Sequence, residues 1–245
     1  MSLTEFVDEV ADRRKRITVY GPEPPDDVSE LFETWNVTVD YEHLPTAPED
    51  AFITVHEGEE FLGGVSAAAL ATLTAPTIGE PWGESDREES YRELLNLLDD
   101  TLFFSGNRRQ LLATSREFEE RAWRRGTGAL HATFQSRDAF GPQVETYGRL
   151  AGQSDLTVHV YAPEEWRPVE AAPEWAPSTD GVHWHHADAD ELHRTWVVAY
   201  DGGDDPEQEC ALVAFEEEPN EYEGFWTYDP ELVDDVVDYL QRNYG

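Results

Sequence analysis

The chain has 245 residues, of which 53 are Asp or Glu and 17 are Lys or Arg, so its formal net charge at pH 7 is −36. This charge disfavours binding to free nucleic acid, whose affinity for proteins comes mainly from neutralised phosphates, and it disfavours anionic membranes for the same reason. Aromatic residues make up 12% of the chain, which argues against a disordered acidic protein, and the acid-rich, lysine-poor composition is typical of folded proteins from salt-in halophiles.

The first third of the chain predicts strands and helices in the order β-α-β-β-β-α. The spacing from Ser2 to Glu5 is that of a capping box, which predicts a short helix at the start of the chain. Apolar periodicity then predicts strands at 17–20, 37–41, 52–56 and 61–65 and helices at 26–35 and 66–73. A loop that contains Trp82 follows these elements.

The remaining chain again alternates between strands and helices. A helix at 91–99 and a strand at 101–105 are expected before the longest helix, 107–125, which ends at Gly126 and Gly128. Strands are then predicted at 130–135, 156–161, 195–200, 210–216 and 222–228, with helices at 141–151 and 230–242. Asp229 and Pro230 begin the last helix, and the proline-rich stretch 163–181 is expected to be an extended loop or a lid.

These elements predict the α/β class, in the form of a mixed α+β sheet flanked by helices. We expect one domain over residues 1–245, because no clear linker divides the chain. The order β-α-β-β-β-α occurs in the range of about 17–75 and again at 130–243, which is consistent with an internal duplication. The alternative is that α/β proteins reuse such units without duplication.

Common catalytic signatures are absent from the sequence, so we expect no enzyme activity and no cofactor. The chain has no P-loop, no dinucleotide-binding glycine pattern, no zinc-protease helix and no nucleophile elbow. Cys210 is the only cysteine and is expected to be a small buried apolar residue. Because residues 1–16 lack a signal-peptide pattern and the longest apolar run, 63–73, is too short to span a bilayer, we expect a cytoplasmic protein.

One stretch has the composition of a metal site, with four histidines and three carboxylates between residues 183 and 193. In a strand, His183 and His185 would project from one face, and with a carboxylate they could hold Zn²⁺ or Ni²⁺. The interpretation we favour is a solvated polar loop that binds no metal. The residues concerned are His183, His185, His186, Asp188, Asp190, Glu191 and His193.

Arginine is concentrated in the window 101–150, which holds eight arginines and five acidic residues. One explanation is internal pairing, since Glu117 with Arg121 and Glu120 with Arg124 have the favourable i,i+4 orientation on a helix. The other is a face that binds an anion or a partner, because the guanidinium fork matches carboxylate and phosphate. Both explanations remain open at this point.

The sequence of helix 107–124 and of the segment 128–135 resembles the DICT sensory domain family, as do the shorter stretches 156–161, 195–198 and 224–230. The resemblance is to the stand-alone haloarchaeal type and covers most of the chain. It implies a sensory or signal-transduction role, and it carries over no catalytic residues. Since the chain contains no recognisable output module, the resemblance implies that any output belongs to a separate protein or to self-assembly.

We therefore hypothesise a non-catalytic cytoplasmic sensor that binds a small ligand or a protein partner. The candidate binding residues lie on the arginine-bearing helix, on the strand after it and on the aromatic strand before the last helix: Arg109, Arg116, His131, Gln135, Trp226 and Tyr228. Trp226 and Tyr228 could instead be core residues, and the Trp82 loop or 163–181 could be a lid. The alternatives are a self-assembling scaffold, with a homo-oligomer as its product, and, less favoured, a metal-dependent enzyme that uses the histidine run.

Overall fold

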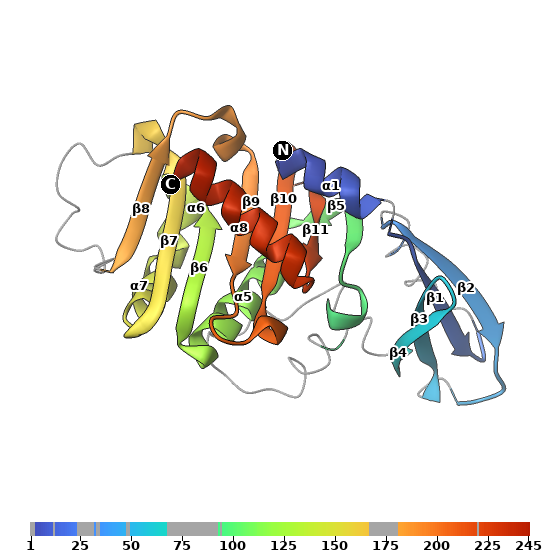
Figure 1. Cartoon of the computed structure of the whole chain (residues 1–245). Coiled ribbons are helices and arrows are strands. Elements are labelled where there is room, and N and C mark those ends of the chain that lie inside the picture. Colours follow the sequence, from blue (N-terminus) through green and yellow to red (C-terminus); the bar gives the residue numbers. More distant parts are fainter. Residues whose placement is uncertain are drawn as a thin grey trace. The chain divides into compact units, whose positions relative to one another are not determined.

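A computed structural model describes residues 3–11, 13–23, 32, 35–47, 50–67, 93, 95–166, 181–219 and 221–245. The strands form two mixed sheets, one of four strands and one of seven, with helices packed beside them (Figure 1). The chain divides into two compact units. Unit 1 comprises Met1–Leu3, Ser115–Glu217 and Thr227–Gly245, and unit 2 comprises Thr4–Thr114 and Glu218–Trp226.

Unit 1 is built on five strands of the seven-stranded sheet, in the order β10-β9-β6-β7-β8. Strands β6, β7 and β8 are parallel to one another, whereas β9 is antiparallel to both β6 and β10. The strands are β6 (Thr127–Thr133), β7 (Asp155–Pro163), β8 (Val182–Ala187), β9 (Thr195–Tyr200) and β10 (Cys210–Glu218). The helices are α5 (Arg108–Arg125, of which unit 1 holds the part from Ser115), α6 (Arg137–Phe140), α7 (Val144–Ala151) and α8 (Pro230–Tyr244). Short 3₁₀ turns lie at η3 (Gly141–Gln143), η4 (Glu164–Trp166), η5 (Asp190–His193) and η6 (Pro206–Gln208).

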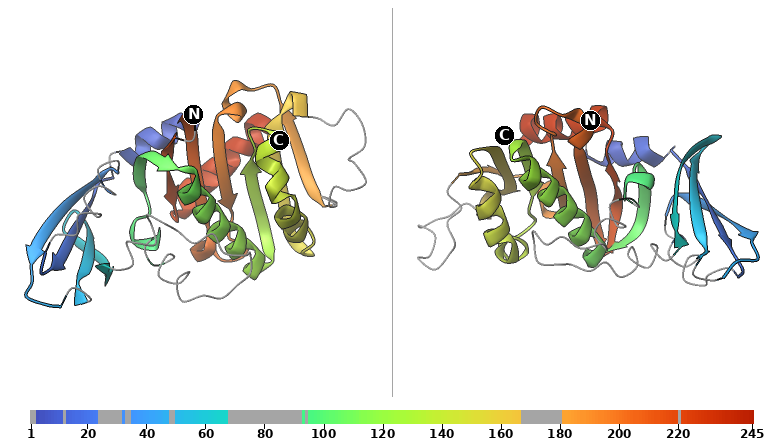
Figure 2. Two further views of the ribbon diagram at one scale, coloured as in Figure 1. Left: turned by 180° about the vertical axis from the view of Figure 1, so that it is seen from behind. Right: turned by 90° about the horizontal axis from the view of Figure 1, so that it is seen from below.

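Helices cover both faces of the unit 1 sheet. Figure 1 shows α8 in front of the strands, and the reverse view in Figure 2 shows α5 and α7 on the other side. The apolar side of α8 is buried, and its members are Leu232, Val233, Val236, Val237 and Leu240. On the opposite face, the ring nitrogen of Trp196 in β9 donates a hydrogen bond to Ser115 in α5 (2.9 Å). Because successive strand residues face opposite sides, each strand contributes side chains to the packing against the helices on both faces of the sheet.

Unit 2 contains the four-stranded sheet, in the order β2-β1-β3-β4, and the antiparallel pair β5–β11. Strand β1 is parallel to β2 and antiparallel to β3, and β3 and β4 form a hairpin. The elements are α1 (Leu3–Ala11), β1 (Lys15–Gly21), β2 (Val37–His43), β3 (Phe52–Glu57), β4 (Glu60–Ser66), β5 (Thr101–Asn107) and β11 (Glu221–Thr227). Buried apolar residues of β1 and β3 form part of its core, namely Ile17, Val19, Ile53 and Val55.

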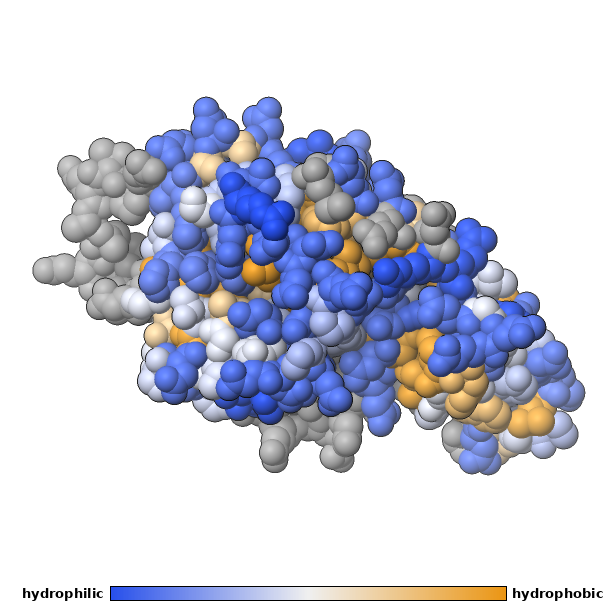
Figure 3. Space-filling model, viewed as in Figure 1, coloured by the Kyte–Doolittle hydropathy of each residue, from blue (hydrophilic) through white to orange (hydrophobic). Residues whose placement is uncertain are grey.

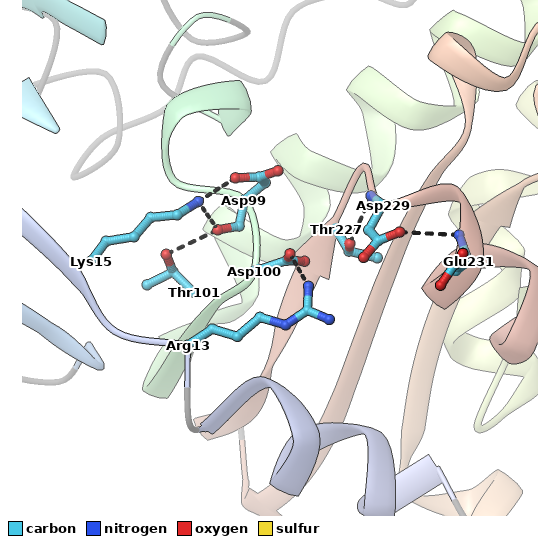
Figure 4. A network of polar contacts seen from close by, with 8 residues as sticks. All are labelled: Arg13, Lys15, Asp99, Asp100, Thr101, Thr227, Asp229 and Glu231. Atoms are coloured by element: carbon cyan, nitrogen blue, oxygen red, sulfur yellow. Dashed lines mark hydrogen bonds and ion pairs between the residues drawn. The ribbon is translucent and has the colours of Figure 1, made fainter. Parts of the chain in front are cut away.

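The chain's only lysine, Lys15, is buried in unit 2 and makes an ion pair (Figure 4). Its ammonium group donates to both the carboxylate and the main-chain oxygen of Asp99. The adjacent Asp100 has a left-handed backbone (φ 49°) and accepts a hydrogen bond from Arg13 (2.5 Å). Burial raises the pKa of Asp99, and the charge of Lys15 opposes that rise. The pair is therefore a structural feature of the turn that precedes β5.

Figure 4 also shows how helix α8 begins in unit 1. The side chain of Asp229 accepts from the main-chain nitrogen of Glu231 (3.1 Å), and Pro230 occupies the first turn. This is the N-cap that the sequence predicts. Proline fits the first turn because the first N–H groups of a helix have no intrahelical partner, so no helical hydrogen bond is lost with the N–H that proline lacks. The prediction of the last helix is confirmed.

The predicted fold class is confirmed, since mixed sheets flanked by helices make up the structure. Several element boundaries differ from the prediction. The helix expected at 141–151 opens with a 3₁₀ turn and becomes α-helical at Val144, and residues 182–187 form a strand where we favoured a loop. Most of the predicted helices 26–35 and 66–73, the Trp82 loop and most of 163–181 lie outside the described residues. The single domain and the duplication remain predictions.

None of the helices in the described ranges is long and apolar enough to cross a membrane.

Candidate functional site

Four histidines gather on the α8 face of the three parallel strands of unit 1. His131 belongs to β6, His159 to β7, and His183 and His185 to β8. The strand register aligns His131 with His159 and His159 with His183, so that three imidazoles form a row across the sheet. His185 lies two residues further along β8, level with Tyr161 of β7. We call these four residues the histidine cluster.

The rings of the cluster are in mutual contact. The imidazoles of His131 and His159 stack at 4.6 Å between centroids, and those of His159 and His183 at 5.2 Å. The Nδ1 atom of His159 lies 2.9 Å from Nε2 of His185, a hydrogen-bond distance that needs one nitrogen to donate and the other to accept. The Nδ1 atom of His131 lies 3.0 Å from the hydroxyl of Tyr161.

Burial increases along the row from the sheet edge inward. His183 is exposed, His159 and His185 are half-buried, and His131 has no exposed surface. The Nε2 atom of His131 is buried and has no hydrogen-bond partner in the described part of the chain. Buried polar atoms are nearly always hydrogen-bonded, so this nitrogen is an exception that requires an explanation.

Burial and mutual repulsion keep the inner imidazoles neutral. Burial, and then the neighbouring His159 and His185, lower the pKa of His131 to about 3. Burial and the adjacent histidines of β8 lower the pKa of His159 to about 4, against a small opposing effect of Asp201. The pKa of His185 is lowered by the same causes. Near neutral pH these three rings therefore act as hydrogen-bonding groups without charge.

The C-terminal end of α8 lies beside the cluster. The ring of Tyr161 makes an edge contact with Tyr244 at 6.4 Å between centroids. Both Tyr244 and Tyr239 donate their hydroxyl hydrogens to the carboxylate of Glu191 in η5, Tyr239 at 2.6 Å. Burial raises the pKa of Tyr161 and of Tyr244, so these hydroxyls remain protonated. A change in the cluster can therefore reach α8 through direct ring contacts.

Residues 88–217 match the family described as a sensory domain in diguanylate cyclases and two-component systems (DICT). The match covers more than half of the chain. The chain belongs to the DICT family. All four histidines of the cluster lie inside the matched range, and the resemblance predicted from the sequence is confirmed at the level of the family.

Other comparisons add little to the DICT assignment. The chain is similar to polyphosphate kinase from Porphyromonas gingivalis, with 11% identity, a TM-score of 0.34 and coverage of 98% of this chain and 48% of that one. It is also similar to phosphatidylserine synthase from Haemophilus influenzae, with 10% identity, a TM-score of 0.26 and coverage of 98% and 83%. These likenesses are too low to carry an argument. No curated protein matches the sequence.

In this DICT protein, Arg116, Arg121 and Arg124 of α5 form ion pairs with glutamates of the same helix. The guanidinium of Arg116 contacts Glu119 (2.7 Å), Thr146 (2.8 Å) and Gln143. The i,i+4 pairs predicted from the sequence are confirmed, since Arg121 lies 3.9 Å from Glu117 and Arg124 lies 2.9 Å from Glu120. The guanidinium of Arg121 also sits 4.7 Å above the ring of Tyr228. Of the two explanations for the arginine-rich window, internal pairing describes these residues.

The six predicted site residues are divided between the two units. Arg116, His131, Gln135 and Tyr228 belong to unit 1, whereas Arg109 and Trp226 belong to unit 2. Trp226 is a core residue there, since its ring nitrogen donates to the main chain of Leu95 (2.9 Å) and its ring packs against Trp35. Arg109 is exposed on the first turn of α5. Gln135 follows β6, and its side-chain nitrogen is buried without a hydrogen-bond partner among the residues that the structure describes.

The histidine run that suggested a metal site is divided between two faces of β8. His183 and His185 share one face, as predicted, and His186 lies with Trp184 on the other, their rings stacked at 6.1 Å. His193 lies apart on η5, 3.3 Å from Glu165. Within the described ranges, no group of three or more His, Cys, Asp or Glu is arranged to hold a metal ion. His159 was not predicted as a site residue, although the alternating pattern of 156–161 is the signal that places it on a strand face.

Proposed function

We propose that this DICT protein is a non-catalytic sensory protein whose input acts on the histidine cluster and whose output is a separate protein. The family assignment supports a sensory role. The composition supports the cytoplasm of a halophile as its setting. A small ligand or a protein partner is the input that we propose.

The observation that carries this proposal is the buried Nε2 atom of His131, which has no hydrogen-bond partner among the described residues. Leaving such an atom unsatisfied costs about 1–3 kcal/mol, so a state in which it gains a partner is favoured by a similar amount. A ligand with a polar atom, or a rearrangement that reaches this nitrogen, would supply that partner. Arg116 is less suited to bind a ligand, because its guanidinium already contacts three side chains.

A thermal-shift screen of metabolites and nucleotides tests the proposal, in about 2 M KCl to screen the acidic surface. Compounds that raise the melting temperature are then tested on His131→Phe and on His193→Phe, a matched control because His193 lies outside the cluster, beside Glu165. We expect His131→Phe to abolish the shift and His193→Phe to retain it. Shifts that persist unchanged in His131→Phe would remove the cluster from the proposed function.

One observation favours the alternative of a self-assembling scaffold. Apolar residues gather over β3 and β4 of unit 2 (Figure 3), where Phe61 is 59% exposed and Phe52 is 37% exposed. Exposed apolar patches often mark contact surfaces between proteins. Light scattering in the same high-salt buffer distinguishes the two functions. A defined oligomer that forms without ligand and is lost in Phe61→Ser supports the scaffold, and a monomer supports the sensor.

A further inference from the structure

We propose that the histidine cluster also responds to protons, and that proton binding releases strand β8 from the sheet of unit 1. This inference rests on the sensory function proposed above and adds a second input to the ligand or partner named there. In this proposal β8 is the strand that moves, and the contacts of the histidine cluster hold it against β7 while the rings are neutral.

The topology makes β8 the strand of unit 1 that is easiest to release. Among the described residues it is the last strand in the sheet order and pairs with β7 alone. Its residues are exposed or half-buried, whereas those of the parallel strand β6, on the other side of β7, are buried from Leu130 to Thr133. Strands with few buried contacts open at a lower free energy than core strands.

The cluster and Tyr161 make side-chain contacts between β7 and β8 on the α8 face. His159 contacts both histidines of β8, with centroids 5.2 Å from each. Tyr161 stacks on His185 at 4.7 Å. The polar contact between these side chains is the 2.9 Å bond from His159 Nδ1 to His185 Nε2. In the neutral state the rings therefore attract through stacking and share one hydrogen.

Protonation converts this attraction into repulsion in two steps. One added proton leaves the bond intact, because a charged imidazole donates to the lone pair of the neutral one. A second proton leaves neither nitrogen able to accept, so the bond is lost. Two positive rings about 5 Å apart then face each other across adjacent strands, and like charges in that position are destabilising. Since one ring belongs to β7 and the other to β8, separation of the strands relieves the repulsion.

The groups around the cluster do little to offset such charges. Tyr161 of β7 and Tyr244 of α8 are neutral, because burial raises the pKa of both hydroxyls. The carboxylate of Glu191 in η5 accepts from Tyr239 and Tyr244. Asp201, directly after β9, favours the charged form of His159, but this effect is smaller than those of burial and of the histidines of β8. In the described part of the chain, no ion pair joins the cluster to a carboxylate.

The direction of the response follows from the lowered pKa values. An imidazole exposed by opening of β8 returns toward the ordinary pKa of about 6.5. The open state then binds more protons than the closed state between about pH 6.5 and the pKa of His159, which is about 4. Acidification in this window favours opening, by up to tenfold per pH unit for each extra proton bound.

Amide hydrogen exchange on the full-length chain tests this inference, at about pH 7 and about pH 5 after correction for the intrinsic pH dependence of exchange. We expect the opening equilibrium of β8 to rise by about tenfold or more on acidification, relative to the amides of β9. His185→Gln and His183→Gln remove ionisable rings and are expected to reduce that response. His193→Gln is the matched control, because His193 is outside the cluster, and it is expected to keep the full response.

Two results would overturn the inference: an acid response of β8 no larger than that of β9, or a full response in the double variant of His183 and His185. If the double variant does not fold, NMR titration of the imidazoles in the unaltered protein decides. The imidazole of His159 must then titrate well below pH 6.5. A titration of His159 near 6.5 would refute the proposal. A ligand-induced thermal shift without any acid response of β8 would refute the proton as input and leave the sensory function standing.

Discussion

The hydroxyl of Tyr161 lies 3.0 Å from Nδ1 of His131, and neither side chain has any exposed surface. The pair joins neighbouring strands β7 and β6 in the interior of unit 1. Since the imidazole of His131 has no other hydrogen-bond partner in the described residues, removal of the hydroxyl would leave both of its ring nitrogens unsatisfied.

We therefore expect Tyr161→Phe to lower the free energy of unfolding by about 1–3 kcal/mol, the cost of a buried polar atom that loses its partner. Urea denaturation at neutral pH measures this change. Tyr20→Phe is the control, because the half-buried Tyr20 keeps its ring stacked on Phe52 after the substitution. Equal stabilities of the two variants would show that the contact contributes nothing.

Lys15→Met should destabilise the protein more strongly. The change leaves the carboxylate of Asp99, whose pKa burial already raises, without its ammonium partner. Loss of one member of a buried pair costs several kcal/mol, and because Asp99 is partly exposed we expect about 2–4 kcal/mol. Denaturant unfolding measures the loss, and Arg16→Met at an exposed position of the same strand is the control. Adding Asp99→Asn to Lys15→Met should restore part of the lost stability. If it restores none, the loss does not come from the ion pair.

Local patterns in the sequence predicted local structure well. The acidic residue and proline before 231 predicted the start of α8, and the spacing of Glu120 and Arg124 predicted their ion pair. Both interactions span four residues or fewer, so helix geometry alone determines them. Strand β8 was not predicted, because an edge strand with one neighbour needs few apolar residues and its polar sequence resembles a loop.

The candidate site could not be predicted in the same way. Its members come from three strands, and 28 positions separate His131 from the residue it stacks on, His159. Each strand shows which residues share a face, but not which residues of the next strand lie opposite. The register between β6, β7 and β8 makes the cluster, and it depends on the connecting segments and on packing.

The two units share a strand order that the sequence only suggested. In unit 2 the order is β2-β1-β3-β4, and in unit 1 the strands β7-β6-β9-β10 follow one another in the same way. The directions also agree, since the first pair is parallel and the next two pairs are antiparallel in both. This agreement motivates the duplication hypothesis, which stays a prediction.

Gly128 should tolerate no side chain. Its backbone is left-handed (φ 85°), and an added Cβ would collide with the carboxylate of Asp201 and lie 2.7 Å from the Cα atom of Gly203. Asp201 accepts hydrogen bonds from the main-chain nitrogens of Ala129 (2.7 Å) and Gly203 (3.0 Å). The collision would therefore break hydrogen bonds that hold this turn. We expect Gly128→Ala to cost more than about 1 kcal/mol in urea unfolding. Gly141→Ala is the control, because nothing lies within 4 Å of its added Cβ, and it should change stability by less than about 1 kcal/mol.

Glu209 should give a pH dependence opposite in sign to that of the histidine cluster. Burial, and then the charges of Asp234, Asp201 and Asp229, raise the pKa of Glu209 to about 7 from an ordinary value of 4.5. Between these two values the folded state binds more protons than the unfolded state, so this group lowers stability as the pH rises from about 4.5 to about 7. The lowered pKa values of the cluster act in the other direction, because they lower stability as the pH falls below about 6.5.

Glu209→Gln keeps the shape of the side chain and removes its charge. At about pH 8 we expect the variant to be more stable than the unaltered protein by about 1 kcal/mol, a value below the full shift because solvent screens part of the repulsion. At about pH 4.5 the difference should vanish, since Glu209 is then protonated in the folded state. Urea unfolding at both pH values measures this, with the exposed Glu207→Gln as control. A variant that is less stable at pH 8 would mean that the Glu209 carboxylate holds a cation or a donor and is not simply repelled by its neighbours.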